Sequence, residues 1–177
     1  MLGSDGRDDS GVEDGAERAV LLATKLHVPA IGGQLVHRAT LIDALSAGRH
    51  RKLTLLSAPA GWGKTIFAAS WLRAGNAARK GVWVGLDEAA DDPHAFWCAV
   101  ASGLMPVVHV PAVEALRRVA AGAVAAEELP GKVATALRLA ANPIAVVLDN
   151  LHEIGSPTCI RGWCDSWSGR PRICPCS

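Results

Sequence analysis

The stretch at residues 53–65, Leu-Thr-Leu-Leu-Ser-Ala-Pro-Ala-Gly-Trp-Gly-Lys-Thr, constrains the fold more than any other part of the sequence. An apolar run ends in small, turn-forming residues, and Gly63-Lys64-Thr65 then opens a helical pattern. In a strand, glycine-rich turn and helix arranged in this order, backbone N–H groups and the positive end of the helix dipole point at phosphate oxygens. The sequence therefore predicts a phosphate-binding loop.

The residues of this loop have separate expected roles. Lys64 would reach the β- and γ-phosphates of a nucleoside triphosphate, and the Thr65 hydroxyl would ligate Mg²⁺. Ala58 stands where the usual G-x-x-x-x-G-K-[ST] pattern has its first glycine, which is a mild departure because the residue is still small. A glycine-rich turn with an unrelated lysine is the alternative. The residues predicted to contact nucleotide in the loop are Ala58, Pro59, Ala60, Gly61, Trp62, Gly63, Lys64 and Thr65.

A second signal lies at residues 144–150, Ile-Ala-Val-Val-Leu-Asp-Asn. Five apolar residues ending in an acid predict a fully buried parallel strand that delivers a carboxylate at its C-terminal end. Because this strand occurs in a chain that also has a predicted phosphate-binding loop, Asp149 is expected to hold Mg²⁺ together with Thr65, directly or through water. Strands at about 53–57, 82–86 and 144–149 alternate with helical segments. The predicted fold class is therefore α/β, a parallel sheet with flanking helices of the P-loop NTPase type.

The segments between these strands read as helices and loops. Pro93 suits the first turn of a helix and Asp92 its N-cap, so the acid-rich loop at 87–93 is predicted to cap a helix rather than to bind metal. Residues 112–141 are alanine-rich and helical in period, with a predicted break at 129–131.

Composition limits the remaining choices. A chain of 177 residues that is half apolar, with a net charge of +1, has room for one globular domain and shows no electrostatic signature for nucleic acid. No apolar run approaches a membrane span, and residues 1–20, which are acidic and glycine-rich near their start, are predicted to be disordered rather than a signal peptide. We therefore expect a cytoplasmic protein. Four of the five cysteines fall after residue 158, at spacings that match no common zinc module.

Several short motifs in order resemble one family, the N-terminal ATPase domain of the large ATP-binding LuxR-type transcriptional regulators. This family, of which the maltose regulon activator is the best-known member, belongs to the signal-transduction ATPases with numerous domains. The resemblance covers roughly residues 21–154. The motifs are Thr24-Lys25-Leu26, Leu35-Val36-His37-Arg38, the loop at 57–65, Trp83, Leu86-Asp87-Glu88, Asp92-Pro93, Phe96-Trp97 and Leu148-Asp149-Asn150.

The resemblance implies a switch that binds ATP or ADP with Mg²⁺ and self-associates in its parent protein. It places Val36 and Arg38 near the adenine, and Asp149 as the acid at the Mg²⁺. Asn150 stands where the family commonly has a second acid, which would orient or activate the attacking water. The chain is therefore expected to be at most a weak ATPase, with no confident catalytic residue. Sensor repeats and a DNA-binding helix-turn-helix are not found in this sequence.

The segment 155–177 departs from the family, and it is predicted to be an aberrant, disordered tail that leaves the ATPase domain at 21–154 incomplete at its C-terminal end. Two other functions stay open at this point. One is a small free-standing P-loop kinase or NTPase, and the other is a non-functional product of a reading-frame change.

Overall fold

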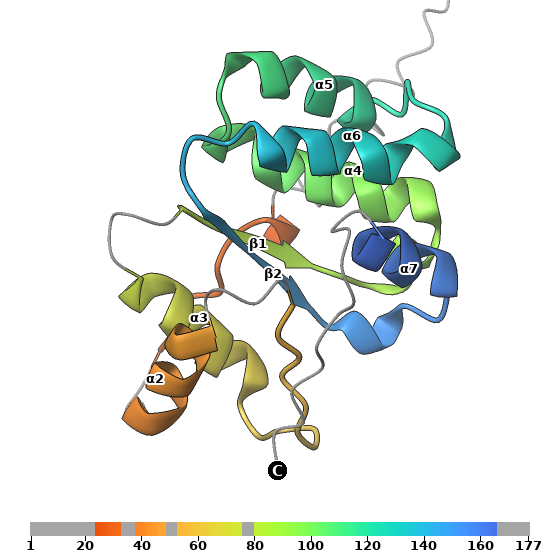
Figure 1. Cartoon of the computed structure of the whole chain (residues 1–177). Coiled ribbons are helices and arrows are strands. Elements are labelled where there is room, and N and C mark those ends of the chain that lie inside the picture. Colours follow the sequence, from red (N-terminus) through yellow and green to blue (C-terminus); the bar gives the residue numbers. More distant parts are fainter. Residues whose placement is uncertain (1–23, 33–37, 49–52, 76–79, 166–177) are drawn as a thin grey trace, which may run out of the picture.

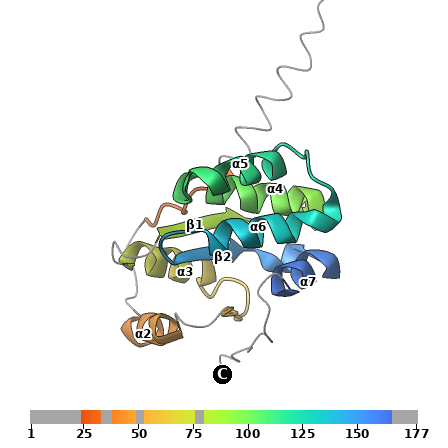
Figure 2. The same cartoon turned by 45° about the horizontal axis from the view of Figure 1, so that its top comes forward.

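The computed structural model describes residues 24–32, 38–48, 53–75 and 80–165. Two strands lie between two groups of helices, with α4, α5 and α6 on one side and α2 and α3 on the other (Figures 1 and 2). The α-helices are α2 (Ala39–Ala47), α3 (Lys64–Ala74), α4 (Pro93–Leu104), α5 (Val110–Ala120), α6 (Leu129–Arg138) and α7 (Pro157–Asp165). The strands are β1 (Lys80–Gly85) and β2 (Ile144–Asp149). Short 3₁₀ turns are η2 (Glu88–Asp91), η3 (Met105–Val107), η4 (Ala126–Glu128) and η5 (Leu151–Glu153). The segment 1–20 lies outside these ranges.

The sheet consists of β1 and β2, which pair in parallel with Lys80 opposite Ile144 and Gly85 opposite Asp149. The strands predicted at 82–86 and 144–149 are thus confirmed within one or two residues. The prediction of a strand at 53–57 is wrong, because these residues carry no regular secondary structure. The prediction that residues 144–149 are fully buried is also wrong. Every residue of β2 is half-buried, since only one of its edges has a partner among the described residues.

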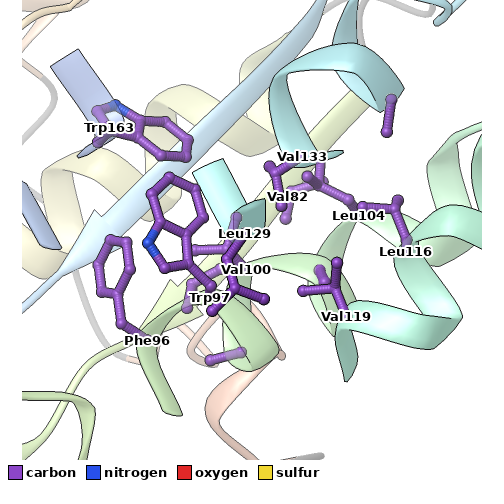
Figure 3. Packing of buried hydrophobic residues seen from close by; sticks show 14 of the residues in the cluster. Val82, Phe96, Trp97, Val100, Leu104, Leu116, Val119, Leu129, Val133 and Trp163 are labelled. Carbon is purple, nitrogen blue, oxygen red and sulfur yellow. The ribbon is translucent and has the colours of Figure 1, made fainter. Parts of the chain in front are cut away.

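The main core lies on the α4 side of the sheet. Apolar side chains from α4, α5 and α6 pack there against Val82 and Val84 of β1. Trp97 stands between Phe96, in an edge-to-face contact with ring centroids 5.1 Å apart, and Trp163, whose ring is stacked at 5.8 Å (Figure 3). A smaller cluster on the opposite face joins Ala68 and Ala69 of α3 to Trp83. Because helices cover both faces of β1, its central residues are fully buried.

Local sequence signals set several helix boundaries. The Asp92 carboxylate accepts a hydrogen bond from the Ala95 N–H at 2.8 Å, so the predicted N-cap of α4 is confirmed. The predicted break at 129–131 is misplaced, because Leu129-Pro130-Gly131 forms the first turn of α6. Proline is tolerated at this position since the first N–H groups of a helix have no partner within it. The chain instead turns between α5 and η4, where Gly122 has a φ of 68°.

The prediction of a disordered tail is wrong for residues 157–165, which form α7. Cys159 and Trp163, one helical turn apart, are buried against the main core. The Asp91 carboxylate accepts a hydrogen bond from the Ser156 N–H at 2.6 Å and fixes the entry to the helix. The i, i+4 spacing of Cys159 and Trp163 was the available sequence signal. Residues 166–177 lie outside the described ranges.

Candidate functional site

The predicted phosphate-binding loop leads directly into α3. Gly61 and Gly63 have φ values of 78° and 75°, in the left-handed region where side chains with a Cβ are disfavoured. No atom lies within 4 Å of the place where a Cβ would stand on either glycine. The glycines are therefore required by the backbone conformation rather than by crowding. Between them Trp62 is 62% exposed. The loop presents its backbone to solvent at the N-terminus of an 11-residue helix.

The Lys64 side chain folds back over the loop. Its ammonium donates hydrogen bonds to the carbonyl oxygens of Ala58, at 2.7 Å, and Pro59, at 3.0 Å. A positive charge is thus fixed at the mouth of the loop by two neutral acceptors. Phosphate oxygens accept stronger, charge-assisted hydrogen bonds than neutral carbonyls do. An anion at this point would compete well for the ammonium.

Thr65 and Asp149 meet across 84 positions of sequence. The Thr65 hydroxyl oxygen lies 3.0 and 3.1 Å from the two carboxylate oxygens of Asp149 and donates to them. The loop-to-helix junction positions the first residue, and the C-terminal end of β2 positions the second. Hydroxyl and carboxylate oxygens are the ligands that Mg²⁺ prefers. The two residues predicted to hold Mg²⁺ are therefore in direct contact, and Thr65 follows Lys64 in the sequence.

Asn150 follows Asp149 in a left-handed conformation, with φ 59° and ψ 36°, and is the one non-glycine residue with positive φ in the described ranges. Asparagine adopts this region more readily than most side chains. Its residue type is thus explained by the turn that follows β2, where its carbonyl accepts a hydrogen bond from the Glu153 N–H at 3.0 Å.

Of the two residues predicted to lie near the adenine, only Arg38 falls within the described ranges. Val36 lies outside the described residues. Arg38 is exposed and precedes α2, where its carbonyl oxygen accepts hydrogen bonds from the N–H groups of Leu41 and Ile42. No hydrogen bond in the described part of the chain joins the Arg38 side chain to the loop.

Two contacts that sequence reasoning missed hold the surroundings of the loop together. Lys25 forms an ion pair with Asp87. Asp87 follows the C-terminal end of β1, which lies beside the C-terminal end of β2 at Asp149. The Trp71 indole N–H donates to the Ser46 hydroxyl at 3.2 Å and ties α2 to α3. Lys25 and Asp87 belong to two of the short motifs of the sequence, Thr24-Lys25-Leu26 and Leu86-Asp87-Glu88. The occurrence of both motifs in one chain was the available sequence signal.

The thiols of Cys98 and Cys159 belong to α4 and α7 rather than to the loop. Burial raises the pKa of Cys159 above its ordinary value of 9.0, despite an opposing hydrogen bond from Ser156. Burial likewise raises the pKa of Cys98, whose thiol donates to the Val119 carbonyl oxygen at 3.0 Å. Across the residues placed by the structure, no three His, Cys, Asp or Glu side chains cluster as a metal centre. None of the helices placed there is long and apolar enough to span a membrane.

Fold and site together define a mixed α/β protein with a two-stranded parallel sheet and a glycine-containing loop where a lysine, a threonine and an aspartate converge. Part of the chain is similar to curated proteins described as the serine/threonine-protein kinase PknK, from two strains of Mycobacterium tuberculosis and from Mycobacterium bovis. The identity is 38% over 78 residues, which is 42% of this chain and 7% of the relative. The chain thus matches only a small part of these relatives. No family model matches it.

Proposed function

We propose that this chain binds ATP or ADP with Mg²⁺ through the loop at residues 58–65, in a domain of the P-loop NTPase type. The convergence of three groups carries this proposal. The Lys64 ammonium lies at the mouth of the loop, while the Thr65 hydroxyl and the Asp149 carboxylate are in contact beside it. Positive charge for the phosphates and oxygen ligands for the cation are the two requirements of a Mg²⁺-nucleotide.

The residues of this chain have distinct parts in the proposed binding. Lys64 exchanges its two carbonyl acceptors for phosphate oxygens, and the open, positive-φ glycines allow phosphate to approach the backbone. Thr65 and Asp149 hold Mg²⁺, which neutralises phosphate charge when bound. Asp149 is held at this point by β2, whose pairing with β1 ends at Gly85 and Asp149.

We further propose that the domain acts as a nucleotide-dependent switch of a cytoplasmic, LuxR-type transcriptional regulator, as the order of short motifs suggests. The partial similarity to a protein kinase of much greater length is compatible with a nucleotide-related role. The loop pattern differs from the G-x-G-x-x-G loop of protein kinases, so kinase activity is not transferred to this chain. Little hydrolysis is expected, since Asn150 cannot act as a base.

The test is a titration of the full chain with a fluorescent ATP analogue in the presence of Mg²⁺. Lys64→Ala removes the charge at the loop, and the loss of one charge-assisted hydrogen bond, about 1.5–3 kcal/mol, should weaken binding by about tenfold or more. Lys132→Ala is the matched control, because Lys132 of α6 forms an exposed ion pair with Glu128 of η4 at 3.7 Å. Equal affinities of the Lys64→Ala variant and the unmodified chain would refute the assignment.

A further inference from the structure

Asp87 and Asp149 follow one another across the C-terminal ends of the paired strands, on the same face of the sheet. Asp149 is on the α3 side, because its carboxylate contacts Thr65 of that helix. Leu86 packs in the main core on the α4 side, and its N–H donates to the Asp149 carbonyl at 3.0 Å. Asp87 continues the extended backbone, with φ −141° and ψ −178°. Since side chains alternate between faces along an extended chain, Asp87 is on the α3 side.

The backbone of Lys25 packs against the last residue of β1 on this same face. A Cβ on Gly85 would stand 3.3 Å from the Lys25 carbonyl oxygen and 3.8 Å from the Lys25 Cα, so glycine permits the close approach. Gly85 is paired with Asp149, which brings Lys25 beside the strand end that holds the Asp149 carboxylate. The Lys25 ammonium then donates a hydrogen bond to one carboxylate oxygen of Asp87.

The ion pair of Lys25 with Asp87 is close enough to Asp149 and Thr65 for one nucleotide to contact both pairs of residues. Strands about 4.8 Å apart, with a rise of about 3.3 Å per residue, place the Cα atoms of Asp87 and Asp149 roughly 8 Å from each other. Mg²⁺ in such sites joins the β- and γ-phosphates. The Lys25 ammonium is carried on a flexible four-carbon stem and has three donors. Among the described residues, Asp87 is the acceptor of one of them.

We propose that Lys25, held by Asp87 beside the Mg²⁺ residues, binds the γ-phosphate and makes the site discriminate ATP from ADP. The inference rests on the proposed nucleotide binding. Charge balance supports it, because Asp87 and Asp149 are both negative, the nucleotide is a polyanion, and Lys64 offsets only one of the two carboxylates. The side chains of Lys25 and Asp87 are 33% and 48% exposed, so a ligand can reach them. An ion pair this exposed contributes little to folding, so stability gives little reason for its position.

The test measures the Kd values of ATP and ADP on the same protein, by displacement of a fluorescent ADP analogue in Mg²⁺ buffer. Lys25→Gln should weaken ATP binding by about tenfold or more and leave ADP binding nearly unchanged, because only ATP carries the γ-phosphate. Lys25→Arg keeps the positive charge and should retain most of the preference for ATP. Lys132→Gln is the matched control and should change neither Kd, since Lys132 forms an exposed ion pair with Glu128.

A double variant separates direct contact with the γ-phosphate from mere neutralisation of Asp87. Lys25→Gln combined with Asp87→Asn removes both charges, and its ratio of ADP to ATP Kd should stay as low as that of Lys25→Gln alone. Recovery of the ratio of the unmodified chain would overturn the proposal, as would an unchanged ratio in Lys25→Gln. In both cases the unmodified chain still binds nucleotide, so the proposed function stands. If the unmodified chain binds neither nucleotide, the proposed function is refuted and this inference with it.

Discussion

Replacing Trp163 by alanine tests whether α7 is an integral part of the domain. The indole is 8% exposed, stacks on Trp97 and belongs to the main core. A buried tryptophan removes roughly 150–250 Å² from water. At about 25 cal/mol per Å² this gives an upper estimate of ~4–6 kcal/mol, in line with the ~3–5 kcal/mol measured for aromatic-to-alanine changes in cores. The free energy of unfolding should fall by about 3–4 kcal/mol, because a site that is still 8% exposed relaxes more easily than the centre of a core.

The assay is urea unfolding followed by circular dichroism, which does not depend on the fluorescence of the deleted tryptophan. Ile160→Ala is the matched control on the same helix, since Ile160 is 38% exposed and its truncation should cost about 1 kcal/mol or less. A loss of 3–4 kcal/mol is a large part of a total stability of about 5–15 kcal/mol. If Trp163→Ala lowers the stability no more than Ile160→Ala does, α7 is not packed as described and this reasoning is refuted.

Three further predictions concern backbone conformation, a buried thiol and hydrolysis. Gly63→Ala should destabilise the fold by about 1–2 kcal/mol, because the φ of Gly63 is 75° and alanine is disfavoured there. Gly131→Ala should instead stabilise the fold by about 0.5–1 kcal/mol, because Gly131 lies in α6 and alanine has the higher helix propensity. Urea unfolding measures both changes. The raised pKa of Cys159 keeps its thiol neutral in the folded protein. The thiol of the unfolded chain loses its proton first as the pH rises through 9, so the free energy of unfolding is at its full value below pH 9 and decreases above it. Between pH 8 and pH 10, the free energy of unfolding should decrease less in the Cys159→Ala variant than in the unmodified chain. Equal decreases in the two proteins would contradict this prediction. Asn150→Asp should fold normally, as aspartate also tolerates positive φ, and should raise ATP turnover above that of a Lys64→Ala control if only the missing acid limits hydrolysis.

The sequence by itself determined the elements whose signals are local. Asp92 and Pro93 start α4 because a side-chain acceptor and a missing N–H both suit the first turn. The apolar run before Asp149 forms β2, and the glycine-containing segment before Lys64 forms the predicted turn that leads into α3. The loop residues from Ala58 to Thr65 form a continuous segment, so their proximity required no knowledge of the fold.

Tertiary structure decided what depends on partners distant in the chain. Residues 53–57 have strand-like composition, yet a strand needs a neighbour for its ladder, and the described residues supply none. β2 is half-buried for the same reason. Residues 157–165 became a packed helix because Trp97 and Asp91 provide the stacking surface and the hydrogen bond at its start. The contact of Thr65 with Asp149 also depends on tertiary structure. The parallel pairing of β2 with β1 and the packing of α3 against β2 place the Asp149 carboxylate beside the Thr65 hydroxyl.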